Sequence, residues 1–318
     1  MTYRKPPRLQ PGDVVGIVAP ASPPPDPKVI DRSLAAIERL GFKPKLAPNA
    51  RKRLGYLAGN DRDRATDLMR MFADPKVKAI FCVRGGYGAS RLLCRLDYDV
   101  IRRNPKIFAG YSDITAIHCA LLTRARLVSF HGPTLNSDLI KEDLVEFTIQ
   151  SFLRTLTHPS APGGICQGYD KSGITILRRG VASGPLFGGN LSLLCSTLAT
   201  PYQPRFNGGI LFFEDIDEAP YRIDRMLTQL LNAGLLQQVA GIAIGVNRNC
   251  LDPKAKRGGE YRQTVEDVIK ERLFPLKIPV VSGLPFGHVP HNATLPVGVS
   301  AVLDARNADL IISEPAVR

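Results

Sequence analysis

Short apolar runs alternate with helical patterns along the first half of the chain. Residues 14–20 and 77–83 are rich in β-branched residues and are typical of buried strands. Residues 28–40 and 61–72 carry apolar side chains at helical spacing between and beside these runs. Strands separated by helices build a parallel sheet with helices on both faces. The alternation therefore predicts an N-terminal α/β domain over residues 1–155.

Two loops that follow predicted strands are expected at one edge of this sheet. Residues 84–88 read Arg-Gly-Gly-Tyr-Gly, and Ser112 stands where the strand through Phe108 turns into a helix. Ligands of parallel sheets bind at the carboxyl ends of the strands. A serine after a strand is most often a helix N-cap, but on a sharp strand-to-helix turn it is the nucleophile of many hydrolases. Both interpretations stay open, because Ile114 stands where the turn motif Gly-x-Ser-x-Gly has its last glycine.

The glycine loop at residues 85–88 has neither the spacing of a dinucleotide-binding loop nor that of a triphosphate-binding loop. Glycines let backbone N–H groups approach a ligand with no Cβ in the way. If Ser112 is a nucleophile, we expect the N–H of Gly85 or Gly86 and the N–H of Asp113 to hold the oxyanion.

The chain changes character after residue 155. Residues 156–178 contain a turn-rich stretch and predict a linker. Residues 179–318 again alternate apolar runs with helical patterns, and some of their strands are of antiparallel type. We therefore expect a C-terminal α/β domain of mixed type. One of its strands, at residues 209–215, ends in two acids.

Composition narrows the classes of function. The formal net charge is +13, but the basic residues are spread along the chain and Trp is absent, which argues against nucleic acid and fits an acidic small substrate. The six cysteines are scattered without a CxxC pair, so we expect no structural zinc and a reducing compartment. No apolar run is long enough to cross a membrane, and the basic N-terminus is a poor signal peptide. These features predict a cytoplasmic protein without a membrane partner.

The acids and histidines leave alternatives open. Residues 214–218 include four acids, which could bind a divalent cation, cap a helix or orient a histidine. Among the five histidines, His131 and His288 both lie in loops after strands and could reach a cleft. The residues alone do not choose between these two.

Taken in order, the motifs resemble the LD-carboxypeptidases of serine peptidase family S66, which also includes the microcin C immunity peptidases. The resemblance covers nearly the whole chain. It rests on Pro11-Gly-Asp13 with residues 18–22, on residues 84–88, 110–113, 131–133, 188–190, 213–215, 221–225 and 287–288, and on Leu295-Pro-Val-Gly298.

The resemblance implies the roles that the residues left open. Ser112 falls on the family's nucleophile, Glu214 on its acid and His288 on its histidine, with Gly86 and Asp113 as backbone oxyanion donors. It also implies a flavodoxin-like or class I glutamine amidotransferase-like N-terminal sheet, a cleft between the domains, no metal, no cofactor and a homodimer.

The implied reaction removes a terminal D-amino acid from an L-centre. The expected substrate is a murein tetrapeptide that loses its last D-Ala in cell-wall recycling, a small peptide with free carboxylates. Arg84 and Arg222 flank the motifs and are candidate carboxylate partners, because Arg binds carboxylates bidentately; Tyr87 is a further candidate contact. Two alternatives are a peptidyl-adenylate immunity hydrolase of the same family and a non-catalytic two-domain ligand-binding protein.

Overall fold

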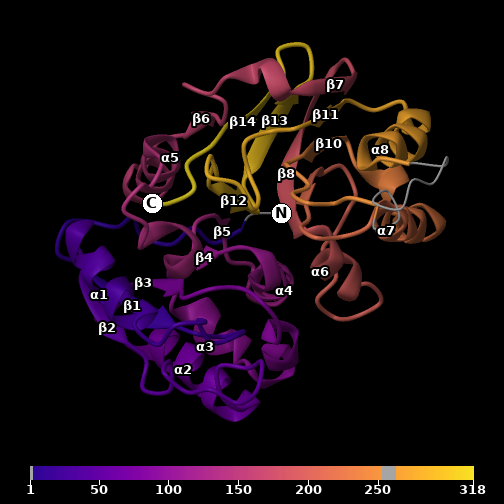
Figure 1. Ribbon diagram of the computed structural model, residues 1–318. Helices are drawn as coiled ribbons and strands as arrows, with labels where there is room; N and C mark the ends of the chain where they lie inside the picture. Colours follow the sequence, from indigo (N-terminus) through magenta and orange to yellow (C-terminus); the bar gives the residue numbers. More distant parts are fainter. Residues whose placement is uncertain (1–2, 253–262) are drawn as a thin grey trace.

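Two sheets, each with helices packed around it, make up the molecule (Figure 1). The computed structural model describes residues 3–252 and 263–318. The first sheet has the strand order β12-β5-β4-β3-β1-β2. Its strands are β1 (Val14–Val18), β2 (Lys43–Leu46), β3 (Val77–Cys82), β4 (Ile107–Gly110), β5 (Ser129–His131) and β12 (Leu295–Val297).

Strands β2, β1, β3, β4 and β5 are parallel, which confirms the predicted N-terminal α/β sheet. Its helices follow the apolar spacing of the sequence, as in α1, whose buried positions include Ile30 and Ile37. A 3-10 helix, Ala89–Arg95, follows the glycine loop. The helices of this half are α1 (Val29–Arg39), α2 (Asp61–Ala73), α3 (Tyr98–Arg103), α4 (Thr115–Ala120) and α5 (Glu146–Thr157).

The second sheet is mixed, as expected, with the order β6-β14-β13-β8-β9-β10-β11-β7. Strands β8 to β11 are parallel, and the flanking strands pair antiparallel. Segment 156–178 contributes the edge strands β6 and β7. The strands are β6 (Gly163–Gly164), β7 (Thr175–Arg178), β8 (Val181–Asn190), β9 (Ile210–Glu214), β10 (Gly241–Ile244), β11 (Val280–Ser282), β13 (Ser300–Asp304) and β14 (Asp309–Ile312), and the helices are α6 (Leu191–Ser196), α7 (Pro220–Asn232) and α8 (Val265–Leu273).

Strand β12 ties the two halves of the chain together. It comes from the C-terminal half but pairs antiparallel with β5 in the first sheet, with Leu295 opposite His131. In Figure 1 this yellow strand lies beside the magenta strand β5. A proline, Pro296, is tolerated here because β12 is an edge strand. The pairing fixes how the second sheet is placed against the carboxyl ends of the first.

No helix among the described residues is long and apolar enough to cross a membrane. All six cysteines are free thiols, and every one except Cys94 is buried. The five buried cysteines act as small apolar side chains in the packing.

Candidate active site

Ser112 lies on a strained corner between β4 and α4. β4 ends at Gly110, Tyr111 is extended, and Ser112 itself has a φ of 65° in the left-handed region. A residue other than glycine in this conformation costs about 1–3 kcal/mol and persists only where the surroundings hold it. The short 3-10 turn that begins at Ser112 then leads into α4. Ser112 is not the N-cap of either segment, since Tyr111 precedes the 3-10 turn and Ile114 precedes α4, so the corner has the geometry of a nucleophile turn.

The glycine loop packs directly against this corner. A Cβ on Gly85 would lie 2.8 Å from the Ser112 Cβ and 3.2 Å from the Asp113 amide nitrogen. A Cβ on Gly86, whose φ is 107°, would lie 2.5 Å from the Ser22 hydroxyl oxygen. Side chains are excluded at both positions, so loop backbone and not a side chain borders the Ser112 hydroxyl.

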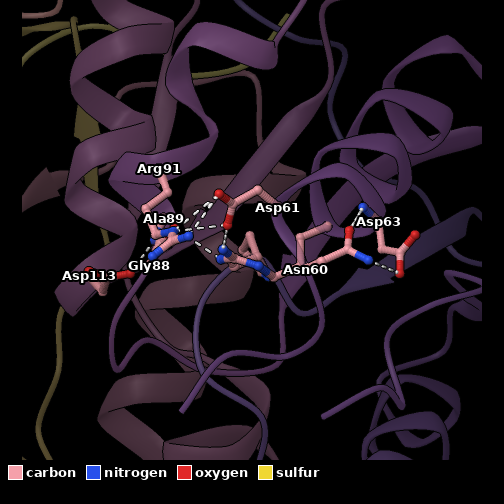
Figure 2. Close-up of polar contacts among 9 residues, drawn as sticks. Asn60, Asp61, Asp63, Gly88, Ala89, Arg91 and Asp113 are labelled. Carbon is pink, nitrogen blue, oxygen red and sulfur yellow. Dashed lines mark hydrogen bonds and ion pairs between the residues drawn. The ribbon is translucent and has the colours of Figure 1, made fainter. Parts of the chain in front are cut away.

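The Asp113 carboxylate holds the loop in place. It is buried and accepts the Ala89 N–H at 2.7 Å, as Figure 2 shows. Burial raises the pKa of Asp113 to about 6, and the backbone N–H groups of Ala89 and Gly88 oppose this shift. Asp113 therefore connects the residue after Ser112 to the end of the glycine loop.

A buried arginine supports the same loop from its other side. Arg64 donates through Nη1 to the Gly88 carbonyl at 2.9 Å and to the Pro20 carbonyl, and through Nη2 to Asp61 at 2.6 Å. Asp61 also accepts from Arg91 Nε at 2.9 Å, a contact that Figure 2 shows. The charge of Arg64 is thus paired, as a buried cation requires.

Glu214 and His288 form the second part of the site. Glu214 ends β9 and is fully buried, and its Oε2 accepts a hydrogen bond from His288 Nδ1 at 2.7 Å. Because the carboxylate can only accept, the Nδ1 proton is fixed and Nε2 is left as the basic nitrogen. A Cβ on Gly287 would lie 2.9 Å from Glu214 Oε2, so a glycine there permits the close approach.

Electrostatics favour a protonated His288. Burial lowers its pKa, but the hydrogen bond and charge of Glu214, with the charges of Asp215 and Asp138, outweigh burial and leave the pKa above 6.5. The other Glu214 oxygen, Oε1, is buried and has no hydrogen-bond partner in the described part of the chain. His288 is therefore the main group that compensates the buried carboxylate.

Tyr111 brings the two parts of the site together. This residue precedes Ser112, and its ring centroid lies 4.8 Å from that of His288. Within the described ranges, the structure records no hydrogen bond between the Ser112 hydroxyl and His288. The hydrogen bond between Glu214 and His288 is formed, whereas the one between His288 and the Ser112 hydroxyl is not.

His131, the other candidate histidine, was expected in a loop but is the last residue of β5, where it lies in an apolar environment. Its two ring nitrogens are buried without hydrogen-bond partners, and its ring contacts those of Tyr111, Phe212 and Phe286. Burial, helped by His118 and His288, holds its pKa well below 6.5. No carboxylate of residues 3–252 or 263–318 is hydrogen-bonded to His131.

The acidic residues of segment 214–218 have different partners and do not form one cluster. Asp215 is buried and accepts from Asn190 Nδ2 at 2.9 Å and from the Ser192 hydroxyl at 2.7 Å, at the start of α6. Glu218 forms an ion pair with Arg222 at 3.4 Å. No group of three or more His, Cys, Asp or Glu that could hold a metal ion occurs in residues 3–252 and 263–318.

The three predicted substrate contacts have different surroundings. Arg84 is half-buried and donates to the Pro23 carbonyl at 3.4 Å. Arg222 is exposed and is held by Glu218 and by the Tyr221 hydroxyl. Tyr87 is exposed and packs edge-on against Tyr56, with ring centroids 5.4 Å apart.

The sequence analysis missed Arg248. This exposed residue follows β10, and its Nη1 donates to the His288 carbonyl at 3.0 Å. Its backbone N–H donates to the Asp215 carbonyl at 3.0 Å, which places it beside the end of β9. The described residues offer it no carboxylate partner. A cation just after a strand at the carboxyl edge of the sheet was the available signal.

Comparison with known proteins finds relatives along nearly the whole chain. Residues 15–132 match the family model of the LD-carboxypeptidase N-terminal domain, and residues 183–303 match that of the C-terminal domain. A probable murein peptide carboxypeptidase of Bacillus subtilis (strain 168) is 41% identical over 97% of this chain and 94% of its own length.

Two solved structures share the whole fold. The muramoyltetrapeptide carboxypeptidase from Oxalobacter formigenes has a TM-score of 0.81 at 33% identity, covering 95% of this chain and 99% of that one. MccF in complex with glutamyl sulfamoyl guanosine has a TM-score of 0.88 at 26% identity, covering 99% of both chains. With both domain models matched in order and a close relative along nearly its full length, the chain belongs to the LD-carboxypeptidase family, peptidase family S66.

Proposed function

We propose that the chain is a serine carboxypeptidase that removes a C-terminal D-amino acid from an L-centre, with D-Ala of murein tetrapeptides as the substrate. The observation that carries the proposal is the oriented Glu214–His288 pair beside the strained Ser112 corner. The murein peptide carboxypeptidase named among the relatives supports the substrate class.

In the proposed mechanism, His288 Nε2 takes the Ser112 proton as the hydroxyl oxygen attacks the amide carbon. This step requires the Ser112 hydroxyl to come within about 3 Å of Nε2. Glu214 keeps the proton on Nδ1 and stabilises the imidazolium that forms. His288 then protonates the leaving amine, D-Ala departs, and water activated by His288 releases the acyl group from Ser112.

The backbone beside Ser112 supplies the oxyanion site in this proposal. The N–H groups of Gly86 and Asp113 would donate to the tetrahedral oxygen, a contribution of about 3–4 kcal/mol per donor in comparable enzymes. The close packing of Gly85 against the Asp113 amide supports this assignment. Asp113 and Arg64 would keep the loop in position while charge develops.

Recognition of the terminal carboxylate needs a cation close to His288. Arg248 fits best, because its guanidinium already reaches the His288 carbonyl and has donors to spare. Arg84 directly precedes the glycine loop and is the second candidate. Arg222 already forms an ion pair with Glu218. Tyr87, exposed at the end of the glycine loop, would contact the remainder of the peptide.

A peptidyl-adenylate hydrolase is the second candidate function. It is favoured by the TM-score of 0.88 to MccF bound to glutamyl sulfamoyl guanosine. An assay that offers both substrate classes separates the two functions, since only the adenylate branch would act on an aminoacyl sulfamoyl nucleoside or its cleavable parent.

The decisive experiment follows D-Ala release from murein tripeptide, tetrapeptide and pentapeptide by wild type and by Ser112→Ala. We expect only the tetrapeptide to lose a residue, and the variant to lose at least about 10⁴-fold in rate while still binding substrate. Ser160→Ala, at an exposed serine, is the matched control and should keep full activity. Native-rate release by Ser112→Ala would reject the proposed mechanism.

The quaternary state and location form part of the same proposal. We propose a homodimer acting in the cytoplasm, where recycled muropeptides are processed. Light scattering coupled to size-exclusion chromatography tests the first point, and fractionation of cells tests the second.

A further inference from the structure

A basic cavity lies at the opposite ends of the strands from Ser112. It has a volume of about 470 Å³ and is lined by Tyr3, Arg102, Leu122, Thr123, Arg124, Arg126, Pro201, Gln203 and Arg205. Arg102 and Arg126 precede β4 and β5, and the loop with Arg205 precedes β9. Ser112 instead follows β4, and Glu214 is the last residue of β9. The cavity is therefore separate from the candidate active site.

The lining is strongly basic. Four arginines face this cavity, and no Asp or Glu is among the described residues that line it. Arg124 and Arg126 are exposed, and the described part of the chain gives neither side chain a carboxylate partner. The Arg124 guanidinium lies 5.9 Å from the Tyr98 ring centroid, which holds it by a cation–π contact without neutralising it.

One aspartate and two helix carboxyl ends offset part of the positive charge of these arginines, but not all of it. Arg102 pairs with Asp99, and its Nη2 donates to the Arg124 carbonyl at 2.8 Å. The carboxyl ends of α3 and of the helical segment through Ala125 contribute about −0.5 each. Three arginines, one aspartate and two helix ends therefore leave roughly one positive charge before Arg205 is counted.

We propose that this cavity binds a small molecule through a phosphate group. Guanidinium groups bind phosphate oxygens bidentately. Those of Arg102, Arg124 and Arg126 line this cavity, and most of their N–H donors form no hydrogen bond within the described part of the chain. The volume lies within the range of roughly 300–1,000 Å³ that is usual for small-molecule pockets. Gln203 and Thr123 add neutral hydrogen-bonding groups to the lining.

The site joins the two halves of the molecule. Arg124 and Arg126 end the helical segment that starts at Ser112, and Gln203 and Arg205 belong to the loop after α6. Helices α4 and α6 pack against each other, as their positions in Figure 1 also show. A ligand held by both segments would stabilise their packing, so binding should be visible as a rise in melting temperature.

The test measures binding of inorganic phosphate, pyrophosphate and glycerol 3-phosphate by calorimetry and thermal melting at constant ionic strength, with glycerol as the neutral probe. The variant is Arg124→Gln/Arg126→Gln. Its control is Arg39→Gln/Arg306→Gln, which removes the same charge from exposed positions elsewhere.

We expect saturable binding of at least one phosphate compound to wild type and control, and an affinity at least about tenfold weaker in the cavity variant. Stronger binding of glycerol 3-phosphate than of the inorganic ions identifies a phosphate ester as the ligand, and the reverse order identifies a free ion. Absence of saturable binding to wild type, or equal affinity in the cavity variant and the control, overturns the proposal. Arg124→Gln alone, with a smaller loss expected, serves if the double variant does not fold.

Discussion

The surroundings of His131 and His288 differ in ways that their sequence positions do not reveal. His131 ends β5, whereas His288 lies in the loop after β11. The Tyr111 ring centroid lies 6.0 Å from that of His131 and 4.8 Å from that of His288. His288 is hydrogen-bonded to a buried carboxylate, and its pKa is raised. The His131 ring contacts aromatic rings, its nitrogens have no hydrogen-bond partner among the described residues, and burial lowers its pKa.

The difference shows what makes a histidine a useful base. Burial alone disfavours the charged ring, as at His131, and gives a neutral group with no oriented lone pair. Burial together with a fixed carboxylate gives a defined tautomer and a stabilised cation, as at His288. Both histidines are buried, so the carboxylate partner is what makes His288, and not His131, suited to act as a base.

The largest effect is expected from removing the base itself. His288→Ala should lower kcat by about 10⁴-fold or more, because no other described side chain beside Ser112 can take its proton. His131→Ala is the matched change in the other environment and should cost far less in kcat. Steady-state rates of D-Ala release from murein tetrapeptide compare the two; equal losses would contradict the distinction drawn here.

Glu214→Gln should have the next largest effect, a loss of about 10²–10⁴-fold in kcat. In wild type, activity should fall as the pH drops through the raised pKa of His288, so the acid limb has its midpoint above 6.5. Without the Glu214 carboxylate, burial lowers the pKa of His288, so the acid limb of the pH profile should move to lower pH. An unmoved limb in the pH profile of kcat/KM would exclude Glu214 as the partner.

The same pair also links folding stability to pH. Because the folded-state pKa of His288 is raised, its contribution to the free energy of unfolding is fully present below about pH 6.5 and is lost as the pH rises through the raised value. Glu214→Gln should therefore lose most stability at acidic pH. Denaturant titrations across this range measure the change.

Gly287→Ala should have a moderate effect on activity. The new Cβ would approach Glu214 Oε2 to 2.9 Å, at a backbone φ of 111° that disfavours a side chain. Displacement of the pair by about 1 Å can cost up to ~10²-fold in rate. Gly12→Ala, at positive φ but with open space around it, controls for backbone strain and should affect stability alone.

His131→Gln should have the smallest effect. The change removes no hydrogen bond, so kcat and its pH profile should stay close to those of wild type, with a stability change of about 0.5–3 kcal/mol. A shift of the acid limb in this variant would mean that His131 takes part in proton transfer.

Local features of this molecule could be predicted from its sequence, and long-range ones could not. The Ser112 corner follows from a strand, a break and a helical pattern within about a dozen residues. The Glu214–His288 bond joins residues 74 positions apart, and local patterns carry no signal for it. Only the family resemblance favoured His288 over His131.

Two further differences have physical reasons. β12 was missed because three residues with a central proline do not form a strand pattern, although they pair at a sheet edge. β8 continues to Asn190, opposite Glu214, because two glycines before Asn190 at positive φ allow the strand to pass close to its neighbours. Arg248 escaped notice because its role depends on contact with the His288 backbone, which the sequence does not display.

One measurement tests most directly whether His288, oriented by Glu214, activates Ser112. A fluorophosphonate probe is reacted with wild type, His131→Gln and His288→Gln across pH, and the labelled residue is located by mass spectrometry. We predict labelling of Ser112 in wild type and in His131→Gln, with a rate that falls as His288 becomes protonated, and loss of labelling in His288→Gln. Labelling of Ser112 that persists in His288→Gln and is lost in His131→Gln would contradict the account.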